Sequence, residues 1–89
     1  MKIKQLKWKK EPTDTFCPTV LGTYSIQKFE GEYFCSLYVE VDILFLGEGS
    51  KSIWQRSCSS IEDGMIVCQN NFEGKLSALI DQYVEKEQQ

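Results

Sequence analysis

A regular alternation of apolar and polar residues constrains this chain most, because it specifies a long β-strand with one buried face. From residue 33 to residue 45 every second residue is apolar, with Ser36, Glu40 and Asp42 among the residues between. Side chains on a strand point alternately to the two faces of a sheet, so this period of two predicts a strand over 33–46. A strand of about 13 residues is unusually long, and we expect it to bend or to carry a bulge.

A second, different period begins near Ser59 and predicts a helix over 60–85. Apolar residues recur there every three or four positions, which places them on one face of a helix. They are Ile61, Met65, Cys68, Phe72, Leu76, Leu79 and Tyr83. The chain offers two capping boxes at the helix start, Ser59 with Glu62 or Ser60 with Asp63.

Shorter alternating segments predict further strands over 3–10, 19–29 and 51–57. In the first, Leu6 and Trp8 alternate with polar residues, and Pro12 follows it. Residues 30–32 have the length and composition of a tight hairpin loop, and residues 47–50 those of another turn. The stretch 15–21 favours β-structure but contains Pro18, which fits an edge, a bulge or a strand start.

These segments predict one α+β domain over residues 1–89. We expect a three- to four-stranded antiparallel sheet with one C-terminal helix packed on one face, a two-layer sandwich. One helix covers only part of such a sheet, because strands lie about 4.8 Å apart and a helix is about 10 Å wide. The opposite face is then expected to be open and to bind a partner or a second copy of the chain. Its candidate residues are Phe34, Tyr38, Leu44, Leu46 and Trp54.

The residue types argue against most enzyme chemistry. The chain has no histidine, which removes the commonest general base and every histidine-ligated metal site. Its four cysteines form no Cys-x-x-Cys pair, so we interpret them as buried reduced thiols, with disulfides or a tetrathiolate zinc site as alternatives. The sequence therefore predicts no enzyme activity, no cofactor and no metal.

Three local patterns have a chemical interpretation beside a simpler one. Glu40 and Asp42 share a strand face and could bind a divalent ion, but a solvated strand face is the favoured interpretation. Cys58 precedes the helix, where backbone amides can lower a thiol pKa, but no histidine is present to serve as its base. Residues 47–52 lack the Walker spacing of a phosphate loop and fit a hairpin turn.

Charge divides the chain into a basic start and an acidic remainder. The first ten residues contain no acid and five lysines, which are Lys2, Lys4, Lys7, Lys9 and Lys10. Residues 11–89 contain the other five basic residues and all thirteen acids, a net charge of −8. An acidic body argues against broad contact with a phosphate backbone. The lysines fit the exposed side of an edge strand, where they discourage aggregation. No signal peptide or membrane span is apparent, which predicts a cytoplasmic protein without membrane contact.

Scattered motifs resemble those of small phage and prophage-encoded accessory proteins. They are Trp8, the strand Gly22-Thr23-Tyr24-Ser25-Ile26, and the helix residues Ser60-Ile61-Glu62-Asp63-Gly64 and Cys68-Gln69-Asn70-Asn71-Phe72-Glu73. The chain departs from that pattern at Gly64, where alanine is usual, and at Lys75, where arginine is common. The resemblance implies a viral accessory role in the host bacterial cytoplasm, and it implies no catalytic residues.

Three functions follow from these observations. The favoured hypothesis is a module that binds and occludes or modulates a host protein through Phe34, Tyr38, Trp54, Glu62, Asp63 and Glu73. The first alternative is a nucleic-acid-binding accessory protein that uses Lys2, Lys4, Lys7, Trp8, Lys9 and Lys10. The second alternative is a homo-oligomer that binds a small ligand or acts as an enzyme.

Overall fold

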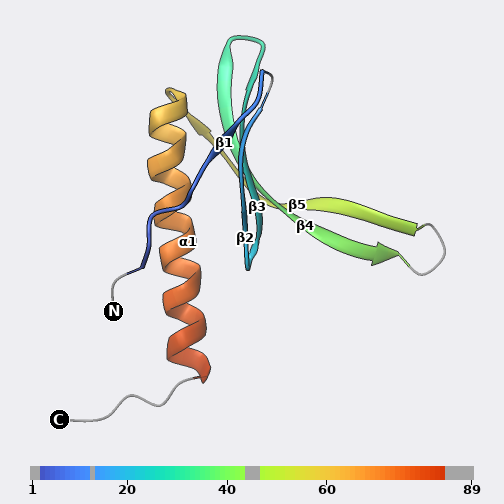
Figure 1. Cartoon of the computed structure of the whole chain (residues 1–89), viewed down its shortest axis with the longest axis vertical. Helices are drawn as coiled ribbons and strands as arrows, with labels where there is room; N and C mark the ends of the chain where they lie inside the picture. The colour runs from blue at the N-terminus through green and yellow to red at the C-terminus, as the bar shows by residue number, and fades with distance from the viewer. Residues whose placement is uncertain (1–2, 13, 44–46, 84–89) are drawn as a thin grey trace.

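The protein is an antiparallel sheet followed by a single helix (Figure 1). The computed structural model describes residues 3–12, 14–43 and 47–83. Within these ranges the elements are β1 (Lys9–Lys10), β2 (Thr15–Thr19), β3 (Gly22–Phe29), β4 (Glu32–Ile43), β5 (Gly47–Cys58) and α1 (Ile61–Tyr83). The strands pair with their neighbours in chain order, β1-β2-β3-β4-β5. The α+β class is confirmed, but the described sheet has five strands rather than three or four.

The additional strand is β2, which sequence reasoning left unassigned because of Pro18. β2 pairs with β3 along its whole length, and Pro18 lies opposite Thr23. On its other side β2 pairs with β1 only at Thr15 and Phe16. At Pro18 the strand is therefore an edge within the described sheet, so the missing proline N–H interrupts no pairing with β1.

The predicted N-terminal strand over 3–10 is wrong for most of its length, since β1 contains only residues 9 and 10. The alternation itself is real, because Leu6 and Trp8 are half-buried and Lys7 is exposed. The side chain of Gln69 on α1, rather than a neighbouring strand, hydrogen-bonds to the backbone of this segment. Its Oε1 accepts from the Leu6 N–H at 2.8 Å, and its Nε2 donates to the Lys4 carbonyl at 3.2 Å.

The two hairpins on either side of β4 differ from each other. Glu30 and Gly31 both have positive φ, 52° and 81°, which gives a two-residue turn of the kind that matches strand twist. The hairpin predicted at 30–32 is thus confirmed, with Glu32 already in β4. The turn predicted at 47–50 is wrong, because these residues bond to β4 and form the start of β5. The connection, residues 44–46, lies outside the described residues, together with Leu44 and Leu46.

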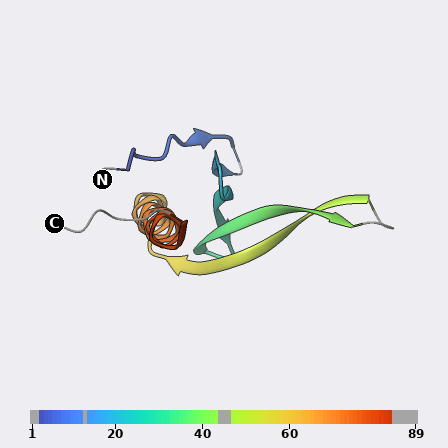
Figure 2. The same ribbon diagram turned by 90° about the horizontal axis from the view of Figure 1, so that it is seen from below.

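The second half of the β4–β5 hairpin extends beyond the rest of the sheet. We call residues 39–43 and 47–51 the arm; Figures 1 and 2 show it leaving the sheet on the side away from α1. β3 starts at Gly22, where φ is 135° and a Cβ would collide with the Tyr38 carbonyl oxygen. The register shifts between Leu37 and Tyr38, which leaves Ile53 as an extra residue on β5. The bulge therefore lies on β5, the partner of the long strand for which an irregularity was predicted.

The core lies between α1 and the near face of the sheet, and Tyr24 is at its centre. Tyr24 is fully buried, and its ring packs edge-on against Trp54 and Phe72, with centroid distances of 6.1 and 6.2 Å. The other buried apolar residues of this cluster are Ile26, Cys35, Leu37 and Cys68. Tyr24 also donates a 2.7 Å hydrogen bond to Asn71 Oδ1. One aromatic side chain thus joins the helix to two strands.

The apolar stripe predicted for the helix packs in the core in the first part of α1 but not at its end. The Ser60–Asp63 capping box is present: the Ser60 hydroxyl accepts from the Asp63 N–H at 3.0 Å, and Asp63 Oδ2 accepts from the Ser59 N–H at 2.9 Å. Leu79 and Tyr83 are 41% and 75% exposed, so the end of the stripe is not part of the core.

Within the described residues no helix combines the length and apolar character needed to cross a membrane.

Candidate binding face

The sheet face that points away from α1 is not covered by any described element (Figure 2). We call this surface the open face. Its residues alternate with the buried ones, so that Ser25 lies between Tyr24 and Ile26, and Ser36 between Cys35 and Leu37. The open face comprises Phe16, Thr23, Ser25, Gln27, Phe34, Ser36 and Tyr38.

The centre of the open face is small and polar, and larger rings stand around it. Phe16, Ser25 and Ser36 are cross-strand neighbours in one row. Ser25 and Ser36 are only 4% and 6% exposed, whereas Phe16, Phe34 and Tyr38 are half-buried. The three rings keep part of their surface in water. Aromatic residues are enriched in protein interfaces, so these rings make the open face a candidate binding surface.

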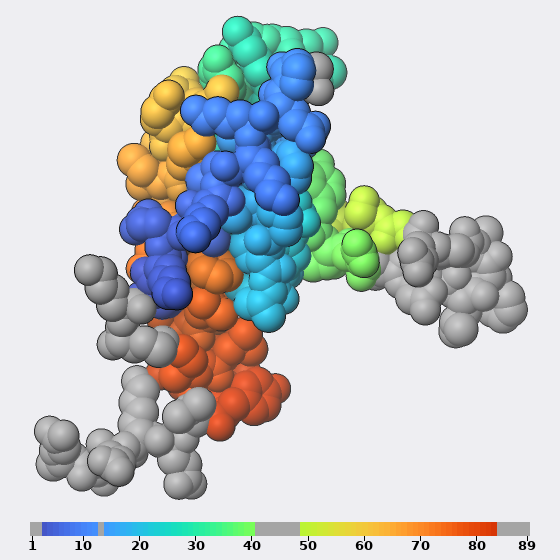
Figure 3. Space-filling model, in the orientation of Figure 1, coloured from blue at the N-terminus to red at the C-terminus, as the bar shows by residue number. Residues whose placement is uncertain are grey.

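A hollow of about 370 Å³ runs over the open face toward the base of the arm. We call it the open-face groove. It lies in the angle between the arm and the β2–β3 pair, where the space-filling view shows the green arm standing out from the cyan strands (Figure 3). Its lining includes Asp14, Phe16, Ser25, Gln27, Tyr38 and Glu40. Asp14 Oδ1 accepts a 2.7 Å hydrogen bond from the Ser25 hydroxyl, which orients its carboxylate.

The structure places two of the predicted open-face residues correctly and one on the other side. Phe34 and Tyr38 lie on the open face, and Tyr38 also lines the groove. Trp54 does not, which corrects the prediction. It is the cross-strand partner of Leu37 and packs against Tyr24 in the core cluster. The bulge at Ile53 adds a residue just before Trp54, and a sequence alone does not show which side of β5 is then buried.

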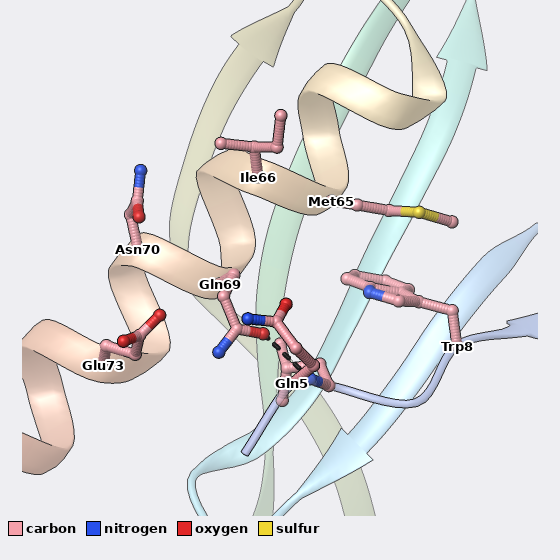
Figure 4. A pocket seen from close by; sticks show the side chains of 8 residues that line it. Gln5, Trp8, Met65, Ile66, Gln69, Asn70 and Glu73 are labelled. Atoms are coloured by element: carbon pink, nitrogen blue, oxygen red, sulfur yellow. Dashed lines mark hydrogen bonds between the residues drawn. The ribbon is translucent and has the colours of Figure 1, made fainter. Parts of the chain in front are cut away.

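The acidic candidates on the helix do not join Phe34 and Tyr38. Glu62 is exposed in the first turn of α1, and the Asp63 carboxylate is engaged in the helix cap. Glu73 lines a separate hollow of about 380 Å³ between α1 and the N-terminal segment (Figure 4). These three side chains therefore belong to the helix side of the molecule, and the open face is a distinct surface.

The N-terminal residues of the nucleic-acid alternative are only partly available. Trp8 is half-buried, and its ring lies against the Met65 side chain in Figure 4. A ring packed in this way has little face left on which a base can stack. The Lys4 carbonyl accepts a hydrogen bond from Gln69. The side chains of Lys7, Lys9 and Lys10 are exposed. Lys2 lies outside the described residues.

The cysteines are free thiols, and three of them, Cys17, Cys35 and Cys68, are buried. The Cys35 Sγ donates a hydrogen bond to the Arg56 carbonyl at 3.2 Å. Burial raises the pKa of every one of the four, that of Cys58 to about 11. The lowered pKa considered for Cys58 is therefore wrong, because loss of water and the neighbouring Cys35 outweigh the backbone amide of Ser60. Among the described residues no group of three His, Cys, Asp or Glu side chains is arranged to bind a metal ion.

Sequence reasoning missed Asp14 and Phe16 as residues of this surface. In the structure Thr15 and Cys17 are buried and Phe16 between them is not, which is the alternation of a strand. The sequence favours β-structure here, but Pro18 left the strand open to other interpretations. Glu40 was recognised as lying on a polar strand face but was paired with Asp42, whose side chain is outside the described part of the structure.

No family model, curated protein or solved structure matches the chain. The open face is therefore the basis of the function proposed below.

Proposed function

We propose that this protein is a small accessory protein that acts by binding another protein through its open face. The resemblance of its motifs to phage and prophage proteins supports a host protein as the target. No catalytic group is assigned to the surface, so the protein would act by occluding or modulating its target.

One observation carries this proposal. The open face holds Phe16, Phe34 and Tyr38 half-exposed around two buried serines, and no described element packs over them. Aromatic residues are enriched in protein interfaces relative to the rest of the surface. Phe16 lies on β2, and Phe34 and Tyr38 lie on β4. Both strands pair with β3, so the backbone of these residues is already ordered and loses little conformational entropy when a partner docks.

Two features favour a protein over a nucleic acid as the partner. The open-face groove is lined by the carboxylates of Asp14 and Glu40, which repel phosphate. Trp8, the aromatic residue of the lysine-rich segment, packs against α1. A protein surface of complementary charge suits this face better.

The proposal is tested by quantitative capture from a bacterial lysate with matched variants. The open-face variant is Phe34→Thr with Tyr38→Thr, because threonine retains β-propensity and removes both rings. The control is Ile66→Gln, an exposed apolar residue on α1 that is 61% exposed. We expect the wild type and the control to enrich the same protein and the open-face variant to lose it, with all three folded by circular dichroism. Equal enrichment by the open-face variant would overturn the proposal.

A further inference from the structure

The open-face groove has a chemistry that specifies the partner more closely. We infer that it binds an extended, basic segment of the partner, with one cationic side chain at each end of the groove. This inference rests on the proposed function and adds the chemical class of the segment recognised.

The two carboxylates of the groove lie at its opposite ends. The Asp14 carboxylate is bonded to the Ser25 hydroxyl, and Ser25 pairs with Ser36 of β4. Glu40 lies four residues further along β4 than Ser36. At about 3.3 Å per residue, the separation along the strand is about 13 Å. An extended segment of about five residues spans this distance.

Charge complementarity selects a cationic occupant. Among the described side chains that line the groove, only Asp14 and Glu40 are charged. The Asp14 carboxylate is half-buried and oriented by its bond from Ser25, so it presents a fixed charge rather than a freely rotating one. Lys9 lies opposite Phe16 on β1, beside the groove and outside its lining. The interior of the groove is therefore acidic.

The walls suit the long stems of arginine and lysine. Phe16 and Tyr38 line the groove between the two acids, and both keep exposed ring surface. Arginine guanidinium groups stack on aromatic rings, and the aliphatic stems of both basic residues pack against apolar surface. Ser25 and Gln27 add polar groups that can hydrogen-bond to the backbone of a segment lying over them.

The middle of the groove lies over β3, whose backbone is already hydrogen-bonded because it pairs with β2 on one side and β4 on the other. A segment lying over β3 is therefore recognised by its side chains. The spacing of its basic residues sets this recognition.

The test is a titration of the ¹⁵N-labelled full chain with synthetic peptides, followed by amide chemical shifts. The probe peptide is Arg-Gly-Ser-Gly-Arg with blocked ends, because its two arginines are about 13 Å apart when the peptide is extended. The matched peptides have both arginines adjacent, or glutamate in place of arginine. We expect the spaced arginine peptide to shift the amides of Thr23, Ser25 and Tyr38 and to bind more tightly than either matched peptide.

Three variants complete the test. Asp14→Asn keeps an acceptor for Ser25, Glu40→Gln keeps the side-chain shape, and each should weaken binding about threefold, as expected for the loss of one exposed ion pair. Glu62→Gln removes the same charge from the helix side and should leave binding unchanged. Equal weakening by all three, shifts confined to other residues, or equal affinity for adjacent arginines would overturn the inference.

The outcome is separable from that of the capture experiment. If capture depends on Phe34 and Tyr38 while the spaced arginine peptide fails to bind, the basic-segment inference is wrong and the proposed function stands. If capture is insensitive to those residues, the proposed function itself is wrong, whatever the peptide does.

Discussion

Asp14 accepts a 2.7 Å hydrogen bond from the hydroxyl of Ser25, and this contact joins a loop carboxylate to the middle of the open face. Asp14 lies just before β2, so the bond also fixes where that strand begins. A buried hydroxyl and a half-buried carboxylate thereby satisfy each other, and the charge stays on the surface of the groove.

The first prediction concerns this bond. Replacing Ser25 with alanine leaves the Asp14 carboxylate without its donor and should lower the free energy of unfolding by about 1 kcal/mol. Ser57→Ala, an exposed serine of β5, is the matched control and should change stability by less than about 0.5 kcal/mol. Urea unfolding measures both, and equal effects would show that the bond does not contribute.

The second prediction concerns the attachment of the N-terminal segment to α1. Gln69→Leu removes two hydrogen bonds, to the Leu6 N–H and the Lys4 carbonyl, and should cost about 1–3 kcal/mol. The exchange of the Leu6 amide hydrogen should accelerate more than that of the Tyr24 amide in the core. Asn70→Ala, its exposed neighbour, serves as the control. A Leu6 amide that remains as protected as in the wild type would contradict this attachment.

The third prediction compares two helix glycines. An alanine Cβ at Gly74 has no neighbouring atom within 4 Å, so Gly74→Ala should stabilise the protein by about 0.5–1 kcal/mol through helix propensity. At Gly64 the same Cβ would lie 3.0–3.1 Å from Ile26 and 3.1 Å from Cys58 Sγ. The crowding should cancel or reverse the gain. Thermal unfolding tests the pair, and equal stabilisation by both substitutions would show that α1 does not pack this closely.

The fourth prediction is a loss of stability at alkaline pH. Burial raises the pKa of Cys58 to about 11 and that of Tyr24 to about 12 in the folded protein. The folded state therefore holds protons that the unfolded state releases, so this stability is present below about pH 9 and is lost as the pH rises toward 11–12. Cys58 is partly exposed, and its share should be about 1–2 kcal/mol.

The Cys58→Ala variant provides the check on this pH dependence. Its unfolding free energy, measured from pH 8 to pH 11, should fall less steeply than that of the wild type because one titrating group is missing. Parallel curves would mean that Cys58 titrates alike in the folded and unfolded states.

The sequence specified the parts of the fold that depend on local periodicity. The alternation in β3 and β4 and the capping box at Ser60 are confirmed because each depends on residues close together in the chain. The side on which β5 is buried was not predictable, since the bulge at Ile53 decides it through the register with β4. β2 was missed because the effect of Pro18 depends on whether a neighbouring strand lies beside it.

The candidate site was predictable to a similar extent. Phe34 and Tyr38 follow from the alternation of a single strand. Asp14 and Phe16 reach the same surface only through the pairing of β2 with β3, a contact between segments that the sequence does not reveal. The hydrogen bonds of Gln69 to the N-terminal segment were not predictable either, because they depend on that segment lying against α1.

The most direct test of the central claim is hydroxyl-radical footprinting of the protein with and without its captured partner. The rings of Phe16, Phe34 and Tyr38 are half-exposed and oxidisable in the free protein, and Tyr83 at the end of α1 is an exposed reference. The account predicts that the partner protects the three open-face rings and leaves Tyr83 as reactive as before. Protection of Tyr83 with unchanged oxidation of Phe34 and Tyr38 would contradict it.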